Sequence, residues 1–277
     1  MQHPAIQPGR TAVITGAASG IGLAAAEALA AEGMGILLID LPGEKLDAAA
    51  TQLADMGATV WAQGADVSDL QALEMVAAAA VELPPVTVLM NNAGMGPPSS
   101  TLGGAAVWRR MLGVNLWGVI HGTMAFSPAM IAHGQRAVII NTGSKQGITT
   151  PPGNPAYNVS KAGVKSFTEA LAHELRNGPG QVSAHLMIPG WVHTGLTAAS
   201  GTPKPAGAWS ADQAVAFLLG SLARDDFYIL CPDNDVARAL DEKRIAWAAG
   251  DIIENRPALS RWHPDWAEAF KAYLAKG

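Results

Sequence analysis

The sequence contains little cysteine and little charge. Cys231 is the only cysteine among 277 residues, so no intramolecular disulfide framework can form, and a reducing cytoplasm is the expected location. Charged residues make up 15% of the chain, and the formal net charge is −5. Proteins that bind nucleic acid carry a basic surface, which this composition does not provide. We therefore expect no nucleic-acid partner.

Long apolar segments are also missing. No uninterrupted apolar run is long enough to cross a membrane, and residues 1–10 lack the apolar stretch of a secretory signal peptide. Hydrophobic residues nevertheless make up 49% of the sequence, which is ample for the core of a large domain. We expect a globular protein without a membrane partner.

Short apolar runs alternate with helical patterns along most of the chain. Seven runs are predicted to be strands, at residues 11–15, 35–39, 59–64, 86–90, 137–140, 182–188 and 227–231. Helix-forming segments lie between them. This alternation predicts an α/β fold, namely a Rossmann-like, doubly wound parallel sheet of about seven strands with helices on both faces.

A glycine-rich turn follows the first predicted strand. The stretch Gly16-Ala17-Ala18-Ser19-Gly20-Ile21-Gly22 separates that strand from a helical pattern. Glycines in this position let backbone N–H groups approach a dinucleotide pyrophosphate, and the helix N-terminus adds partial positive charge. The spacing is neither Gly-x-Gly-x-x-Gly nor that of a P-loop. The context still predicts a dinucleotide phosphate site.

Asp40 ends the second predicted strand. An acid about 20 residues after such a turn accepts hydrogen bonds from the adenosine ribose hydroxyls. The same residue could also cap the following helix, and the two roles are compatible. No Arg or Lys lies within the glycine turn or directly after Asp40. A 2′-phosphate would meet a carboxylate there, so the sequence favours NAD over NADP.

Polar residues follow two further predicted strands. Asn91-Asn92-Ala93-Gly94 comes after the fourth strand, and Ser144 comes shortly after the fifth. The carboxyl ends of strands in open α/β sheets are where ligands bind. Asn115 lies inside a long helical pattern at about residues 105–131. Taken alone, Ser144 is typical of a turn and Asn115 of a tolerated surface position.

Tyr157 and Lys161 are four residues apart in a helical pattern, so they share one face of the helix. A cation about 5 Å from a phenol, at an effective dielectric of about 20, favours phenolate by roughly 3 kcal/mol, or about two pKa units. The pair is therefore a plausible general acid/base. The alternative is an amphipathic helix with a packed tyrosine and a lysine that reaches solvent.

These motifs together resemble the short-chain dehydrogenases/reductases of the shorter, single-domain type. Thr15-Gly16-x-x-x-Gly20-x-Gly22 is similar to the cofactor motif of that family, Asn91-Asn92-Ala93-Gly94 to its sheet-stabilising motif, and Pro189-Gly190-x-x-x-Thr194 to its nicotinamide-side motif. The resemblance covers roughly residues 10–231. It implies an NAD-dependent oxidoreductase that interconverts a secondary alcohol and a ketone.

The resemblance also implies roles for individual residues. Tyr157 would donate or accept the proton, and Ser144 would polarise the substrate oxygen. Lys161 would hold the nicotinamide ribose and lower the tyrosine pKa, while Asn115 would anchor a water relay to Lys161. Lys145 stands where many relatives have a small residue, and we expect it to point to solvent.

The positions expected to bind the cofactor form a longer set, and no metal site is expected. They are Gly16, Ser19, Gly20, Ile21, Gly22, Asp40, Asp66, Val67, Asn92, Ala93, Gly94, Tyr157, Lys161, Pro189, Gly190, Val192 and Thr194.

No linker or repeat divides the chain, so residues 1–277 are expected to form a single dinucleotide-binding catalytic domain. The segment near 191–209, rich in Gly, Pro, Thr and Ala, is the expected substrate loop, and residues near 233–277 are expected to form a helical C-terminal extension. Family members commonly pair two long helices across a two-fold axis, so the resemblance also implies a homodimer or homotetramer.

The substrate is expected to be a largely hydrophobic small molecule. Trp191, Leu196, Trp209 and residues 95–98 are the basis for this expectation, and no cluster of Arg or Lys near the loop indicates a strongly anionic substrate. The alternative function is a catalytically silent NAD-binding sensor or scaffold, a class that typically lacks the tyrosine or the lysine. A hydrolase built on Ser144 and Lys161 would leave the glycine turn and Asp40 without a purpose.

Overall fold

The structure is a computed structural model and describes residues 2–178, 181–197 and 202–275. Seven parallel strands form one sheet in the order β3-β2-β1-β4-β5-β6-β7. The strands are β1 (Thr11–Thr15), β2 (Gly35–Asp40), β3 (Val60–Gly64), β4 (Val86–Asn91), β5 (Ala137–Thr142), β6 (Val182–Ile188) and β7 (Tyr228–Leu230). The predicted fold class is confirmed.

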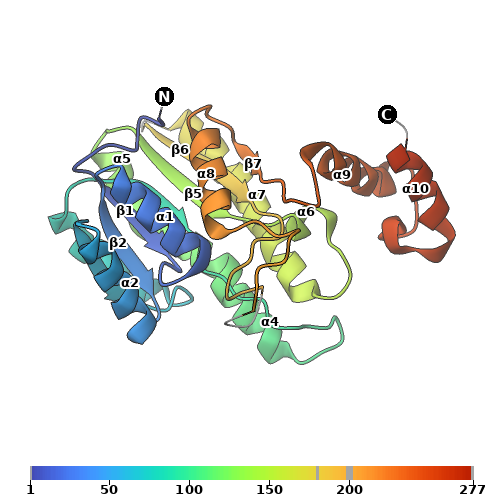
Figure 1. Ribbon diagram of the computed structural model, residues 1–277, viewed down its shortest axis with the longest axis horizontal. Helices are drawn as coiled ribbons and strands as arrows, with labels where there is room; N and C mark the ends of the chain where they lie inside the picture. Colours follow the sequence, from blue (N-terminus) through green and yellow to red (C-terminus); the bar gives the residue numbers. More distant parts are fainter. Residues whose placement is uncertain (1, 179–180, 198–201, 276–277) are drawn as a thin grey trace.

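Helices connect successive strands and cover both faces of the sheet (Figure 1). They are α1 (Gly20–Ala31), α2 (Glu44–Asp55), α3 (Leu70–Ala79), α4 (Ala105–Leu112), α5 (Gly118–Ala132), α6 (Gln146–Thr149), α7 (Pro155–Asn177), α8 (Ala211–Leu222), α9 (Arg238–Ile253) and α10 (Ala267–Ala275). Short turns are η1 (Ala80–Glu82), the π-helical η2 (Gly113–Trp117), η3 (Ser260–Trp262) and η4 (Pro264–Trp266). The long helical region expected at about 105–131 is therefore interrupted by a π-helical turn.

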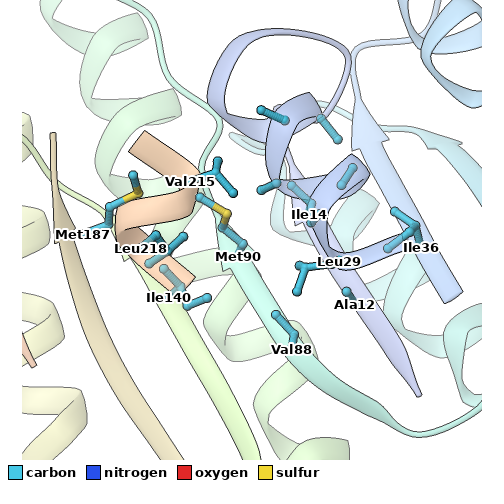
Figure 2. Close-up of a cluster of buried hydrophobic side chains, with 14 of the residues drawn as sticks. Ala12, Ile14, Leu29, Ile36, Val88, Met90, Ile140, Met187, Val215 and Leu218 are labelled. Carbon is cyan, nitrogen blue, oxygen red and sulfur yellow. The ribbon is translucent and has the colours of Figure 1, made fainter. Parts of the chain in front are cut away.

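The central strands are buried on both faces, which explains why they read as continuous apolar runs rather than as alternating ones. Ile14 points to the face covered by α1, α2 and α8, where it packs with Leu29 and Val215. Figure 2 shows side chains from β1, β2, β4, β5, β6, α1 and α8 meeting there. Val13 points to the opposite face, where α3 and α5 supply Leu73 and Phe126. The sheet is thus the middle layer of three.

Two asparagines at the carboxyl ends of adjacent strands join the sheet to its helices. The Asn91 Nδ2 donates to Thr123 Oγ1 of α5 at 3.1 Å and to Asn141 Oδ1 at 2.9 Å. Asn141 Nδ2 in turn donates to Thr168 Oγ1 of α7 at 3.0 Å. All four residues are buried, so these bonds are made in a low-dielectric interior. They hold α5 and α7 in place beside the sheet edge at which the strands end.

The strands β2 and β3 extend the sheet on one side of β1, and β4 to β7 extend it on the other. The strand order therefore changes direction between β1 and β4. In doubly wound sheets this switch point opens a crevice at the carboxyl ends of the strands. The glycine turn after β1, the asparagines after β4 and Ser144 after β5 all lie at that edge. The topology therefore collects the motifs that the sequence carries on separate strands.

The C-terminal helices α9 and α10 lie side by side and project from one edge of the molecule (Figure 1). They share a small aromatic core, in which the Trp247 ring contacts Trp266, Phe270 and Tyr273. Trp247 Nε1 also donates to Ser260 Oγ at 2.7 Å. The extension thus has packing of its own, in addition to the contact of α9 with α6.

Among the residues described, no helix is both long and apolar enough to cross a membrane. The expected substrate loop near 191–209 includes residues 198–201, which lie outside the described residues. Within the described part of this segment, Val192 and Trp209 form an isolated β-bridge.

Candidate active site

One cleft of about 700 Å³ at the carboxyl edge of the sheet gathers most of the residues singled out in the sequence. Of the expected catalytic residues, Ser144, Tyr157 and Lys161 line it. Every expected cofactor-binding position lines it as well, with the exception of Gly22. Asn115 is fully buried behind the cleft wall. Residues scattered over nearly 180 positions of sequence, from Gly16 to Thr194, therefore meet in one place.

The glycine turn needs its glycines because other backbone passes very close to it. A Cβ on Gly16, whose φ is +66°, would lie 2.6 Å from the Ala93 Cα. A Cβ on Gly22 would lie 2.2 Å from the Gly16 carbonyl oxygen. Neither contact is compatible with a side chain, so the turn is pressed against the end of β4. Gly22 is a packing glycine behind the turn, which explains why it does not line the cleft.

The turn is also fixed by hydrogen bonds from the end of β4. Thr15 Oγ1 accepts from the backbone N–H groups of Asn92 at 3.0 Å and Ala93 at 3.2 Å. The Asn92 side chain donates to the carbonyl oxygens of Thr15 and Gly16, both at 3.3 Å. At the other end of the turn, α1 begins at Gly20, and its N-cap residue Ser19 makes no side-chain capping bond. The first N–H groups of α1 therefore remain available to an anion.

Asp40 lies at the carboxyl end of β2 and faces the glycine turn. Its Oδ2 accepts from the Ala18 N–H at 2.9 Å, and its Oδ1 accepts from the Leu41 N–H at 2.8 Å. These bonds fix the carboxylate at the rim of the cleft and leave further lone pairs open. Lys45, from the first turn of α2, lines the same cleft. The sequence argument counted only residues next to Asp40, so the fold adds one cation to its surroundings.

Asn115 occupies the π-helical turn η2, where its side chain binds backbone instead of facing solvent. Asn115 Oδ1 accepts from the Met95 N–H at 2.8 Å, and Nδ2 donates to the Met95 carbonyl oxygen at 2.9 Å. Nδ2 also lies 3.2 Å from Ser160 Oγ. An asparagine is unfavourable inside an α-helix, and π-turns occur frequently at functional sites. The residue joins the loop after β4 to α7, the helix that carries Tyr157.

The Lys161 ammonium is buried beneath the cleft floor. Its Nζ donates to the Thr142 carbonyl oxygen at the end of β5, at 2.8 Å, and lies 5.8 Å from the centre of the Tyr157 ring. Burial disfavours a charge, and it lowers the pKa of Lys161 from 10.5 to about 8. The ammonium is therefore close to losing its proton at mildly alkaline pH.

The pKa of Tyr157 is not lowered, contrary to the sequence-based expectation. Burial raises the pKa of its phenol above 10.0, and the hydrogen bond with Ser144 only partly opposes this. The expectation was wrong because it counted the charge of Lys161 and left out the desolvation of the phenol. Ser144 Oγ also accepts from the Gln146 N–H at 3.2 Å, which fixes the serine beside the tyrosine.

Lys145 does not point to solvent, contrary to the expectation. Its Nζ lies 3.2 Å from Asp233 Oδ2 and 2.5 Å from Asp241 Oδ2. The contact with Asp241 is an ion pair that lacks hydrogen-bond geometry. Asp233 Oδ2 also accepts from the Trp191 N–H at 3.2 Å. Lys145 thus connects the segment that holds Ser144 to α9 and to the loop after β6. Sequence alone does not predict these contacts, because Lys145 and the two aspartates are about 90 residues apart.

Other cleft residues also escaped the sequence argument. Thr142 and Thr197 line the cleft, as do Arg109 and Arg110 of α4. Thr142 ends a strand, so the carboxyl-end rule could have included it. The arginines carry no local signal, because only the packing of α4 brings them to the cleft.

Two tryptophans expected around the substrate lie elsewhere. Trp209 packs on Phe217, with 5.7 Å between ring centres, against the core on the α8 side. Trp191 is 44% exposed, and neither tryptophan lines the cleft. The apolar cleft residues from the expected set are Met95, Pro97 and Leu196.

Comparison with known families gives one match over most of the chain. The family model described as short chain dehydrogenase matches residues 10–204. Among curated proteins, the chain is 31% identical over 260 residues to 1-deoxy-11-beta-hydroxypentalenate dehydrogenase of Streptomyces exfoliatus, a match that covers 91% of this chain and 94% of the relative. It is 39% identical over 193 residues to galactitol 2-dehydrogenase (L-tagatose-forming) of Cereibacter sphaeroides, covering 68% and 74%.

Solved structures give the same result. A short-chain dehydrogenase/reductase from Burkholderia phymatum in complex with NAD superposes with a TM-score of 0.82 at 32% identity, covering 92% of this chain and 97% of that one. A metagenomic short-chain oxidoreductase in complex with NADP superposes with a TM-score of 0.67 at 28% identity, covering 82% and 98%.

The burial of Lys161 predicts an effect on stability. The folded state binds the proton more weakly than the unfolded chain, so below about pH 8 the buried ammonium lowers the free energy of unfolding by about 3 kcal/mol, and this penalty disappears as the pH rises from about 8 to 10.5. The Lys161→Met variant lacks this penalty, but it also loses the hydrogen bond to Thr142, which stabilises the fold by about 1 kcal/mol. We expect the variant to be more stable at pH 7 by about 1–2 kcal/mol.

Chemical denaturation at pH 7 and pH 10 measures this effect. Lys165→Met, one turn later on α7 and paired with Glu169 at the surface, is the matched control and should change stability by less than about 0.5 kcal/mol. The wild type should gain stability between pH 8 and 10 relative to Lys161→Met. A Lys161→Met protein less stable than the control at pH 7 would contradict the buried-charge account.

Proposed function

The chain belongs to the short-chain dehydrogenase/reductase family of oxidoreductases, and we propose that it interconverts a secondary alcohol and a ketone with NAD as the hydride carrier. One observation carries the proposal: Ser144, Tyr157 and Lys161 line the same cleft as the glycine turn and Asp40. A cofactor bound at the turn and a substrate bound at the tyrosine would share that cleft. The relatives named above as dehydrogenases support the same class of reaction.

The cleft fits a dinucleotide on structural grounds. Gly16 leaves room that a side chain would fill, and α1 presents its first N–H groups without a side-chain cap or an acidic residue in its first turn. Both features suit a pyrophosphate. Asp40 would accept from ribose hydroxyls, and Pro189, Gly190 and Thr194 line the same cleft. When bound, the dinucleotide supplies the hydride acceptor or donor.

Three side chains then account for the proton chemistry. In the oxidation direction Tyr157 accepts the proton of the alcohol, and in the reduction direction it returns the proton to the ketone oxygen. Ser144 donates a hydrogen bond to that oxygen and stabilises the charge that develops on it. Lys161 binds ribose hydroxyls and contributes positive charge near the phenol. Because burial alone raises the pKa of Tyr157, positive charge in the cleft is needed to make the phenol an effective base.

The substrate is proposed to be a largely hydrophobic small molecule. Met95, Pro97, Val192 and Leu196 form apolar parts of the cleft wall. We also propose that residues 1–277 form one catalytic domain with its substrate loop near 191–209, and that the protein acts in the cytoplasm, for which the single, buried cysteine Cys231 is the support.

Replacement of the tyrosine tests the function. Tyr157→Phe removes the acid/base but keeps the shape of the side chain, so turnover should fall by at least about a hundredfold, while NADH binding stays near the wild-type value. The assay is NAD reduction with a panel of secondary alcohols at alkaline pH, where the phenolate form increases. Tyr273→Phe, in the C-terminal extension, is the control and should retain its activity.

The same assay separates the proposal from its alternative. A catalytically silent NAD sensor or scaffold would bind NADH and reduce no NAD with any alcohol of the panel. Retention of most of the wild-type kcat by Tyr157→Phe would show that another group moves the proton.

Cofactor preference follows from Asp40. Charge-assisted bonds from ribose hydroxyls to the carboxylate contribute roughly 1.5–3 kcal/mol, and a 2′-phosphate would be repelled by it. We expect kcat/KM to favour NAD over NADP by about a hundredfold. Asp40→Ala should narrow this ratio, and Lys45→Ala should widen it, because Lys45 is the cation nearest in sequence to Asp40 that lines the cleft. A wild type that prefers NADP, or an unchanged ratio in Asp40→Ala, would refute this assignment.

A homo-oligomer is proposed from apolar side chains left at the surface. Trp117 of η2, Met124 of α5 and Val159 of α7 are 52%, 56% and 49% exposed, and η2 packs against both α5 and α7. A second copy of the chain could cover this patch in an isologous interface, as a dimer or, with modest preference, within a tetramer. Sedimentation velocity at micromolar concentration should show the oligomer, and Met124→Lys should weaken it, whereas Met75→Lys on α3 should not. A wild type that sediments only as a monomer would rule it out.

A further inference from the structure

A second cavity, of about 280 Å³, lies between the segment around α6 and the C-terminal extension. Lys145, Arg244 and Arg261 line it together with one carboxylate, Asp241. None of its lining residues lines the nucleotide cleft. The two cavities are nevertheless neighbours along the sequence, because Lys145 of this cavity directly follows Ser144 of the cleft.

The two carboxylates near the cavity already pair with a lysine. Asp241 and Asp233 both contact the Lys145 ammonium, at 2.5 Å and 3.2 Å. Within the described ranges 2–178, 181–197 and 202–275, no ion pair or hydrogen bond joins either carboxylate to Arg244 or Arg261. The lining therefore holds two guanidinium groups that neither carboxylate contacts directly, although the charge of Asp241 acts on both.

Both arginines also lack hydrogen-bond acceptors among the described residues. The Arg244 Nε is buried and has no hydrogen-bond partner. The Arg261 guanidinium lies over aromatic rings, 4.6 Å from the centre of Trp262 and 5.3 Å from that of Phe270, and no described residue accepts a hydrogen bond from it. Burial, followed by the charge of Arg244, lowers the pKa of Arg261. A guanidinium has five donors, and leaving them unpaired in a partly buried site is unfavourable.

Arg256, in the same extension, shows how neighbouring groups hold a structural arginine, although its Nε, like that of Arg244, lacks hydrogen-bond geometry. Its Nε lies 3.1 Å from Asp251 Oδ1, its Nη2 donates to the Trp247 carbonyl oxygen at 2.6 Å, and its guanidinium stacks on the Trp247 ring at 4.1 Å. The extension therefore supplies partners for an arginine that serves its packing. Arg244 and Arg261 differ in that neither pairs with a carboxylate of the described residues and both line a cavity.

The remainder of the lining is largely apolar, since Ile148, Leu230, Ile245 and Trp262 contribute to it. We propose that this cavity is a binding site for a small-molecule anion with an apolar body, whose carboxylate or phosphate group lies between Arg244 and Arg261. Arginine binds such groups through paired N–H donors. The site is separate from the proposed oxidoreductase cleft and does not depend on its activity.

Isothermal titration of the full-length protein tests the proposal, with benzoate and phenyl phosphate as anionic probes and benzyl alcohol as the neutral control. Each titration is made without NAD and repeated with saturating NAD, because the glycine turn of the cleft also attracts anions. We expect saturable binding of at least one anionic probe in both conditions and none of benzyl alcohol. The tighter of the two probes identifies the preferred acidic group.

Variants then locate the binding site. Arg244→Gln and Arg261→Gln should each weaken the anion at least tenfold, and Arg261→Lys, which keeps the charge but loses the paired donors, should weaken it less. Arg238→Gln is the matched control, because Arg238 lies on the same helix, is exposed and pairs with Glu242.

Three results would overturn the proposal. They are no saturable binding of either anion to the wild type, binding to the Arg244→Gln and Arg261→Gln variants with the affinity of the wild type, and displacement of the probe by NAD. Because no turnover is measured, an inactive enzyme that still binds the probe would refute the proposed function and leave this site standing.

Discussion

The burial of the Lys161 ammonium is the constraint on which the candidate active site depends. Among the described residues, its Nζ donates only to the Thr142 carbonyl oxygen at the carboxyl end of β5, so the charge is fixed to the sheet edge and not to a flexible loop. Such a charge is costly to bury. It is compatible with the fold because the surrounding edge is held by the Asn91–Asn141 bonds and by Asn115, which clamps Met95. Tyr157 and Ser144 take their positions around this fixed cation.

The sequence alone was sufficient for the sheet and for the edge at which the site lies. Short apolar runs that alternate with helical patterns predict all seven strands, and the carboxyl-end rule then brings Gly16, Asn92 and Ser144 together from the sequence alone. Sequence could not give the pKa of Tyr157, because burial is a property of the whole fold and outweighs the charge one turn away. It also missed the interruption of the long helix at η2, which only the bonds of Asn115 explain.

Contacts between distant segments account for the remaining differences. Lys145 reads as a surface residue next to a serine, yet it pairs with Asp233 and Asp241, which lie about 90 residues later. The expectation that no cluster of Arg or Lys lies near the substrate loop considered only neighbours along the chain. Folding of α9 and η3 places Arg244 and Arg261 beside Lys145. The C-terminal extension is therefore more than an added cap, because it supplies charge to the segment that holds Ser144.

We propose that Tyr157 is the proton-transfer group and that positive charge in the cleft controls its ionisation. The protein has three tyrosines, so tyrosine labelled with ¹³C at Cζ gives a simple NMR titration in which single substitutions assign each signal. The account predicts that Tyr157 titrates above pH 10 in the free protein, and that its pKa falls when NAD⁺ binds, while that of Tyr273 does not change. A Tyr157 signal whose titration is the same with and without NAD⁺ would contradict the account.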